Sequence, residues 1–208
     1  LNRTYDQLKL RYMDTIEALR QAVDARDIYT RGHSDRVAYY AMEVGKALEL
    51  SSEELETLRI GGIFHDIGKI GTADDILLKY DKLSDAELKE IQKHPLKGAR
   101  ILSAVSMFKD VVPVVKCHHE RIDGTGYPEG LSGESIPLLA RIISVADAFD
   151  AMMSDRIYRS RLNIDQARQQ LLNGAGTQFD AYIVSVFINI IDRMTEEGML
   201  TEAAASFE

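Results

Sequence analysis

The sequence has little cysteine and no long apolar run, and each absence excludes a class of protein. Cys117 is the one cysteine among 208 residues, which rules out an internal disulfide and is typical of a reducing cytoplasm. No apolar run approaches the roughly 20 residues that span a bilayer, and the first residues show no signal-peptide pattern. We therefore expect a cytoplasmic protein without membrane contact from this chain.

Basic residues are too few for a surface that binds polyanions. The formal net charge is -8, whereas binding of DNA, RNA or anionic lipid draws on broad basic patches. A nucleic-acid polymer is therefore not an expected partner, and an anionic ligand would need a local positive site. With 45% hydrophobic residues, the chain can bury a core for one large domain or a domain with an appendage.

Alternation of apolar and polar residues with period two is almost absent. Apolar residues instead recur at helical spacing, so the expected fold class is all-α, a compact helical bundle. Ser51 with Glu54 and Ser84 with Glu87 offer capping boxes, and Asn163 is expected to cap a later helix. The predicted helices run over about 34–50, from the Ser51 cap to near Gly68, from the Ser84 cap, from Pro95, over about 111–120, from Pro137, from Asn163, and from Asp180 to about Met194.

The first residues follow a heptad-like pattern at Leu1, Tyr5, Leu8, Tyr12, Thr15, Leu19 and Ala22. Such steps indicate either a dimerisation helix over residues 1–22 or a helix that packs along its own domain. Because the sequence begins with Leu1 and not methionine, we expect a piece of a longer protein that has an N-terminal sensory or receiver domain. The predicted division is an N-terminal or linker helix over 1–24 and a catalytic domain over 25–208.

Glycines and prolines cluster in a long segment between Ile122 and Pro137. This composition is typical of a loop. A loop of this length without a helix of its own is more often functional than connective. We expect it to contribute to a binding or active site.

All five histidines lie in segments that look like metal ligation. They are His33, His65, His94, His118 and His119. The His65-Asp66 pair alone is weak evidence, because a helical histidine is more often packed or solvated. Adjacent imidazoles before a glycine-rich loop have little structural use, and imidazole suits iron, manganese, zinc, cobalt or nickel better than magnesium or calcium. With Asp66 and Asp147, five imidazoles and two carboxylates suffice for two metal ions with open positions.

Two neighbours of these histidines have competing interpretations. Lys69, four residues after His65, would lie on the same helical face and place an ammonium beside the metals. A solvated lysine at a helix end is the alternative. Cys117 directly precedes the histidine pair, and we interpret it as a small packed residue, because the ligand set is complete without it.

Five segments together resemble the HD-GYP domain, a branch of the HD metal-dependent phosphohydrolases. They are GHSDRV at 32–37, HDIGK at 65–69, HPLKGARIL at 94–102, HHERIDGTGYP at 118–128 and ARIISVADAFDAMMSDRIYR at 140–159. The resemblance covers roughly residues 25–195. It implies an all-helical HD fold with a Gly/Pro-rich active-site loop, and a phosphodiesterase that hydrolyses cyclic di-GMP to linear pGpG, with further conversion to GMP left open.

The resemblance also implies roles for individual residues. A first metal would be held by His33, His65, Asp66 and Asp147. A second would be held by His94, His118 and His119, with Asp66 bridging the two ions. Asp66 and Lys69 would be the catalytic residues, and Lys69 would contact a substrate phosphate. Further substrate contacts would come from Gly126, Tyr127, Pro128, Arg156 and Arg159, although Tyr127 as a loop anchor and Arg159 as a solvated side chain are alternatives.

The implied cofactors are two divalent transition-metal ions, iron or manganese first, with zinc, cobalt or nickel open. Some family members have a glutamate for a third metal where this chain has Tyr29, one turn before His33. Two ions with neutral imidazoles leave the site positive enough to attract an anionic dinucleotide. The expected chemistry is in-line attack on phosphorus by a metal-bridging hydroxide.

Two further departures from the family pattern and two other functions stay open. Lys79-Tyr80-Asp81 stands where relatives often have Lys-Pro-Gly, and Ala181 replaces a usual proline. The alternatives are another HD-type nucleotide phosphohydrolase and a cyclic di-GMP sensing module without turnover. His94, His118, His119 and the Gly-Tyr-Pro loop disfavour the first alternative, and the intact ligand set disfavours the second.

Overall fold

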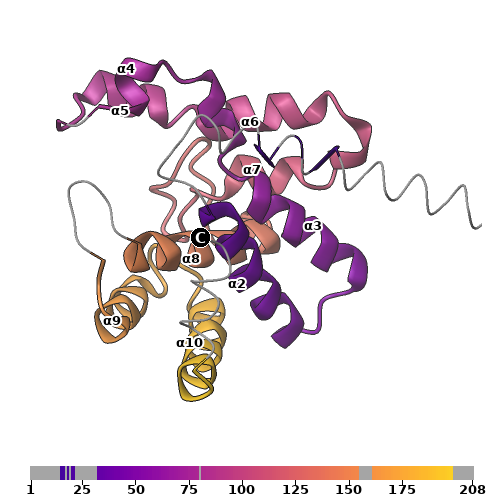
Figure 1. Ribbon diagram of the computed structural model, residues 1–208, viewed down its shortest axis with the longest axis vertical. Coiled ribbons are helices and arrows are strands. Elements are labelled where there is room, and N and C mark those ends of the chain that lie inside the picture. The colour runs from indigo at the N-terminus through magenta and orange to yellow at the C-terminus, as the bar shows by residue number, and fades with distance from the viewer. Residues whose placement is uncertain are drawn as a thin grey trace, which may run out of the picture.

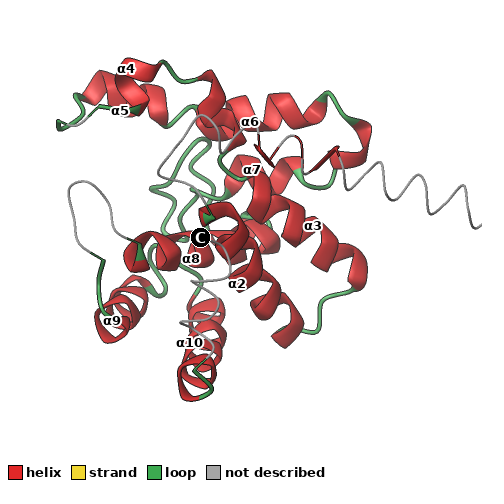
Figure 2. Cartoon of the chain, viewed as in Figure 1, coloured by secondary structure: helices red, strands yellow, loops and turns green. Residues whose placement is uncertain are grey.

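The computed structural model describes residues 15, 16, 18, 20, 21, 32–79, 81–154 and 161–198. Within these residues the chain forms helices and loops without a strand, and a single parallel bridge joins Ala175 and Phe179 (Figure 2). The all-α fold predicted from the apolar spacing is confirmed. None of the helices in this described part is long and apolar enough to cross a membrane.

The helices follow one another along the chain, and the long glycine-rich loop lies between α7 and η4 (Figure 1). Their order is α2 (His33–Ala47), α3 (Ser52–Phe64), the 3-10 helix η2 (Ile67–Gly71), α4 (Asp74–Leu77), α5 (Asp85–Ile91), α6 (His94–Ser103), η3 (Ser106–Phe108), α7 (Val112–Cys117), η4 (Gly133–Ser135), α8 (Leu138–Met153), α9 (Ile164–Gly174) and α10 (Ala181–Glu196). Helices α4 and α5 lie at one end, away from α9 and α10 (Figure 1).

Helix α8 is the centre of the larger core. It contacts α2, α3, α7, α9 and α10, and its residues Ile142, Ile143 and Phe149 are fully buried. The ring of Phe149 packs edge-on against Tyr40 of α2 and Phe187 of α10, with centroids 5.2 and 5.1 Å apart. This packing fixes α8, and with it the acidic residues that α8 carries, relative to the start of α2.

A second core cluster joins α3, α6 and α7. Phe64 and Phe108 are fully buried and meet edge-on at a centroid distance of 5.7 Å, and Leu102 and Val115 pack in the same cluster. Burial of such aromatic and aliphatic side chains is the main stabilising contribution in a helical domain. The cluster brings the ends of α3 and α7 close to the start of α6.

The predicted helix starts are confirmed by the caps. Ser51 with Glu54 and Ser84 with Glu87 form reciprocal capping boxes. Asn163 caps α9 in the same way, and the Asp180 side chain accepts hydrogen bonds at the start of α10. Pro95 and Pro113 lie in the first turns of α6 and α7, where proline costs no helical hydrogen bond.

Three predicted helix ends were wrong. Helix α2 ends at Ala47, because the amides of Glu49 and Leu50 turn back to the carbonyls of Lys46 and Gly45 in a Schellman motif. Helix α3 ends at Phe64 instead of continuing to Gly68, and a 3-10 helix follows. Helix α7 ends at Cys117 instead of Glu120, so the histidine pair lies in the turn after the helix.

Several predictions concern residues outside the described ones. These are the N-terminal heptad pattern, of which Thr15 alone is described, together with Tyr29, Tyr80, Arg156 and Arg159. Ile16 beside Thr15 is buried in the second core cluster. The dimerisation helix and the two arginine contacts therefore stay predictions.

Candidate metal centre

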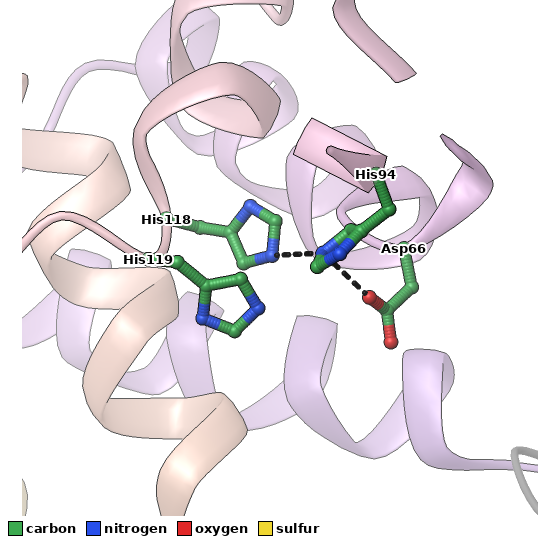
Figure 3. Close-up of side chains that lie close together, drawn as sticks. All are labelled: Asp66, His94, His118 and His119. Atoms are coloured by element: carbon green, nitrogen blue, oxygen red, sulfur yellow. Dashed lines mark hydrogen bonds and ion pairs between the residues drawn. The ribbon is translucent and has the colours of Figure 1, made fainter. Parts of the chain in front are cut away.

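Seven predicted ligands come together from five segments of the chain. His33 begins α2, His65 and Asp66 follow α3, and His94 begins α6. His118 and His119 follow α7, and Asp147 lies in α8. Four of these side chains are drawn in Figure 3, where the imidazoles of His94, His118 and His119 and the carboxylate of Asp66 gather around one point.

One group consists of Asp66, His94, His118 and His119. Their candidate donor atoms all lie within 4.8 Å of one another. His94 Nε2 is 3.2 Å from Asp66 Oδ1 and 3.3 Å from His118 Nε2 (Figure 3). Three imidazoles and one carboxylate oxygen are a donor set that can hold a divalent transition metal.

A second group shares the same aspartate. Donor atoms of His33, His65 and Asp66 lie within 4.8 Å of one another. Asp147 Oδ1 is 3.3 Å from His33 Nε2 and 3.8 Å from His65 Nε2. Since Asp66 directs Oδ1 toward His94 and has Oδ2 3.4 Å from His65 Nε2, its carboxylate stands between the two groups.

Helix ends orient three of the histidines. The Nδ1 atoms of His65, His94 and His118 lie 2.8, 2.8 and 2.7 Å from backbone carbonyl oxygens three residues earlier, those of Gly62, Ile91 and Val115. These carbonyls belong to the last turns of α3, α5 and α7, where no helical N–H follows to bond them. Because a carbonyl only accepts, each Nδ1 carries the proton and each Nε2 offers a lone pair.

The Nε2 atoms of these histidines converge. His65 Nε2 is buried and has no hydrogen-bond partner, and the Nε2 atoms of His94 and His118 approach to 3.3 Å. Burial, and next the neighbouring His119, lower the pKa of His118 well below its ordinary value. Burial lowers the pKa of His119 to about 4. The neutral imidazoles of His118 and His119 and the converging Nε2 atoms fit a cation, so the residues present suit a bound metal ion.

Lys69 is fixed beside the shared aspartate. Its Nζ lies 2.6 Å from Asp66 Oδ2. Burial opposes ionisation of Asp66, but Lys69 and the nearby histidines keep the pKa of Asp66 well below its ordinary value. The ammonium is thus near the two groups as predicted, although η2 places it there through Asp66 and not through a helical face shared with His65.

Gly68 makes the approach of η2 to α6 possible. A Cβ at this position would lie 1.9 Å from the carbonyl oxygen of His94 and 2.5 Å from the amide nitrogen of Gly98. No larger residue can occupy this contact without separating the two segments. The glycine of HDIGK therefore brings Asp66 and His94 within reach of one another.

Asp150 was missed by the sequence analysis. Its carboxylate is buried and accepts hydrogen bonds from His33 Nδ1 at 2.7 Å and Arg36 Nε at 2.7 Å. Burial alone would lower the pKa of His33, but its hydrogen bonds to Asp147 and Asp150 prevail and raise it to about 9. The sequence spacing could have indicated this contact. Asp150 follows Asp147 by three residues and Arg36 follows His33 by three, so each pair lies on one face of its helix.

The glycine-rich loop lies against the histidines. The ring of Tyr127 is 4.8 Å from that of His119, and the Tyr127 amide donates to the His119 carbonyl. The buried carboxylate of Glu120, also missed from the sequence, accepts the amide protons of Glu129 and Leu131 at 2.7 and 3.0 Å. These contacts anchor the loop on both sides of Gly126-Tyr127-Pro128.

Comparison with known proteins identifies the family of this chain. A family model described as an HD domain matches residues 17–183. The chain belongs to the HD domain family. The family predicted from the five sequence motifs is therefore confirmed.

Relatives and solved structures of this HD domain carry related names. It is 37% identical to the 3'3'-cGAMP-specific phosphodiesterase 3 of Vibrio cholerae, over 88% of this chain and 40% of that protein. It is also 37% identical to the cyclic di-GMP phosphodiesterase response regulator RpfG of Xanthomonas campestris, over 88% and 49% respectively. A crystal structure of a cyclic GMP-AMP-specific phosphodiesterase from V. cholerae matches with a TM-score of 0.65 and 23% identity, over 85% of this chain and 48% of that one. The chain thus spans half or less of the length of these relatives.

Cys117 plays no part in the donor groups of this HD domain. It is buried among Ile136 and Ala140 in a small apolar cluster, as expected for a packed residue. Burial raises the pKa of its thiol to about 11, which keeps the sulfur protonated and a poor ligand.

Proposed function

We propose that this HD domain is a metal-dependent phosphodiesterase that hydrolyses cyclic di-GMP to linear pGpG. The observation that carries the proposal is the convergence of buried imidazole lone pairs from His65, His94 and His118 around Asp66. Such an arrangement has little use in a packed core, since it leaves His65 Nε2 buried without a hydrogen-bond partner. Relatives named as cyclic di-GMP phosphodiesterases supply the substrate class.

The proposed cofactors are two divalent transition-metal ions, iron or manganese. His33, His65 and Asp147 would hold one, and His94, His118 and His119 the other, with Asp66 shared between them. When bound, such ions polarise a phosphoryl oxygen and lower the pKa of water. Metal analysis that finds three ions per chain would contradict this stoichiometry.

The residues of the chain supply binding and orientation. Lys69 Nζ lies 2.6 Å from Asp66 Oδ2, and this position beside the two donor groups supports a role for its ammonium as a contact for a substrate phosphate. The Tyr127 ring beside His119 offers an aromatic face for a guanine base. We further propose Gly126, Pro128, Arg156 and Arg159 as substrate contacts.

A second cyclic dinucleotide is favoured by one specific observation. The relative named as a 3'3'-cGAMP-specific phosphodiesterase is as similar to this chain as the cyclic di-GMP relative, at 37% identity. The two substrates differ in one base, so the phosphate and metal chemistry would be shared. Discrimination between them would depend on the residues that contact the bases.

The test is hydrolysis by manganese- or iron-loaded protein. Cyclic di-GMP, 3'3'-cGAMP and GTP are incubated separately, and the products are separated by chromatography. We expect pGpG from cyclic di-GMP, loss of turnover in His65→Ala, and full turnover in Tyr182→Ala, whose side chain is 67% exposed on α10. Metal-loaded protein that binds cyclic di-GMP without cleaving it would favour a sensing module, and cleavage of GTP alone would favour another nucleotide phosphohydrolase.

We also propose that residues 1–24 form a linker or dimerisation helix ahead of the catalytic domain. The support is the heptad-like spacing of Leu1, Tyr5, Leu8 and Tyr12. Deletion of residues 1–22 should convert a dimer into a monomer, as measured by sedimentation. If the shortened protein sediments as the same oligomer as the full chain, the helix packs along its own domain instead.

A further inference from the structure

His33 is held differently from the other histidines of the candidate metal centre. The Nδ1 atoms of His65, His94 and His118 donate to neutral backbone carbonyls. His33 Nδ1 instead lies 2.7 Å from a carboxylate oxygen of Asp150. Among the four histidines whose Nδ1 partner the described residues supply, His33 alone is therefore held by a charged side chain.

Asp150 is itself firmly placed. It is 1% exposed, and the guanidinium of Arg36 approaches both of its oxygens, with Nε 2.7 Å from Oδ1 and Nη2 3.1 Å from Oδ2. The Ser154 hydroxyl lies 3.4 Å from Oδ2. A two-point contact of this kind fixes the plane of a carboxylate as well as its position.

Helix α8 thus contacts both nitrogens of the same imidazole. Asp147 and Asp150 are one turn apart, and Asp147 Oδ1 lies 3.3 Å from His33 Nε2 while Asp150 lies beside Nδ1. A carboxylate behind a ligating imidazole fixes the orientation of the ring and makes its other nitrogen a better electron donor. Backbone carbonyls orient the ring but carry no formal charge.

We propose that Asp150 is a positioning residue for one metal ion, the ion of His33, His65, Asp66 and Asp147, and that it acts on this ion selectively. The inference rests on the proposed two-metal function. The ion of Asp66, His94, His118 and His119 relies on carbonyls for the orientation of His94 and His118. The two ions are therefore inequivalent, and loss of the Asp150 charge weakens only the first.

The deciding experiment is equilibrium binding of manganese to metal-stripped protein, measured as bound ions per chain against free manganese. Asp150→Asn keeps an oxygen that can accept the His33 Nδ1 proton but removes the charge, whereas Asp150→Ala removes both. We expect Asp150→Asn to weaken one of two ions about 10- to 100-fold, the usual effect of losing such a partner. The second ion should change less than twofold, and Asp150→Ala should weaken the first ion further.

A matched control is Asp192→Asn on α10. Asp192 forms an ion pair with Arg168 at 3.1 Å on a half-exposed surface, so the chemical change is the same and both metal affinities should be retained. A second readout is rescue, because raising free manganese about 100-fold should restore kcat in Asp150→Asn by refilling the weakened position. If Asp150→Asn fails to fold, Arg36→Lys keeps the charge but loses the two-point contact, and should weaken the same ion by a smaller factor.

Each outcome separates the two proposals. Wild-type protein that binds fewer than two ions contradicts the two-metal function itself. Two ions in the wild type with unchanged affinities in Asp150→Asn contradict the role of Asp150. Equal weakening of both ions, without rescue of kcat by manganese, would show that Asp150 supports the fold as a whole and would also overturn the inference.

Discussion

Gly68→Ala is the substitution for which the structure makes the sharpest prediction. The added Cβ would lie 1.9 Å from the carbonyl oxygen of His94, where ordinary van der Waals contact begins near 3.4 Å. Backbone atoms on both sides form the contact, so η2 and α6 must move apart by roughly 1.5 Å, the difference between these two distances. Asp66 is two residues before Gly68, and His94 supplies the clashing carbonyl.

The expected magnitude follows from the tolerance of metal sites and cores. Overpacking of a close contact costs about 1–3 kcal/mol and occasionally more, and a shift of this size places Gly68→Ala at about 3 kcal/mol. Donor distances in metal sites are held to within about 0.2 Å, which is far less than the required separation. We therefore expect the ion shared by Asp66 and His94 to be lost from protein that remains folded.

Chemical denaturation measures the first effect, and metal content by elemental analysis measures the second. Gly71→Ala is the matched control in the same 3-10 helix, because its Cβ would meet only the flexible Lys97 side chain at 3.0 Å. This control should retain both ions and lose less than about 1 kcal/mol. Gly68→Ala with normal stability and two ions per chain would refute the claim that close packing of η2 on α6 builds the site.

Three further predictions concern the loop, the core and the metals. Glu120→Gln leaves one of the Glu129 and Leu131 amides without its acceptor, so the free energy of unfolding should fall by about 2 kcal/mol. KM for the cyclic dinucleotide should rise while the metal content stays unchanged. An unaltered KM would show that the loop keeps its shape without this carboxylate. Phe187→Ala removes a fully buried ring, so the free energy of unfolding measured in urea should fall by about 3–5 kcal/mol. Protein that stays folded should keep its metals. Loss of metal at native stability would contradict this separation of core and site. Chelation should lower Tm, and manganese should restore it, because a ligand bound by the folded state alone stabilises that state; equal Tm values for stripped and loaded protein would argue against bound ions.

Helix starts were predictable from the sequence, whereas the ends of α2, α3 and α7 were not. The capping boxes at Ser51 and Ser84 join residues three positions apart, so both partners can be found in the neighbouring sequence. The end of α3 depends on the contact of Gly68 with His94, which comes from another helix. The end of α7 similarly precedes His118, whose ring turns toward atoms from distant segments. Long-range packing decides where the last turn stops.

The candidate ligands were predictable as residue types, and their supporting residues were not. Histidines and aspartates in family-like motifs are recognisable as candidates because imidazoles and carboxylates are common metal ligands. The structure brings all seven together. Asp150 and Glu120 look like ordinary acidic residues in the sequence. The partner of Asp150, His33, is 117 positions away, and Glu120 holds amides nine and eleven positions further on. Such partners become visible only in three dimensions.

The anchoring of His65, His94 and His118 by main-chain carbonyls has an evolutionary consequence. A carbonyl is present whatever residue stands at Gly62, Ile91 or Val115, so point mutation cannot delete these anchors and selection has little to act upon there. Asp150 and Arg36 are side chains and can be exchanged by single substitutions. We therefore expect related proteins that differ in metal preference to differ at the α2–α8 contact. The carbonyl supports of His65, His94 and His118 should be the same in all of them, because the helices themselves provide them.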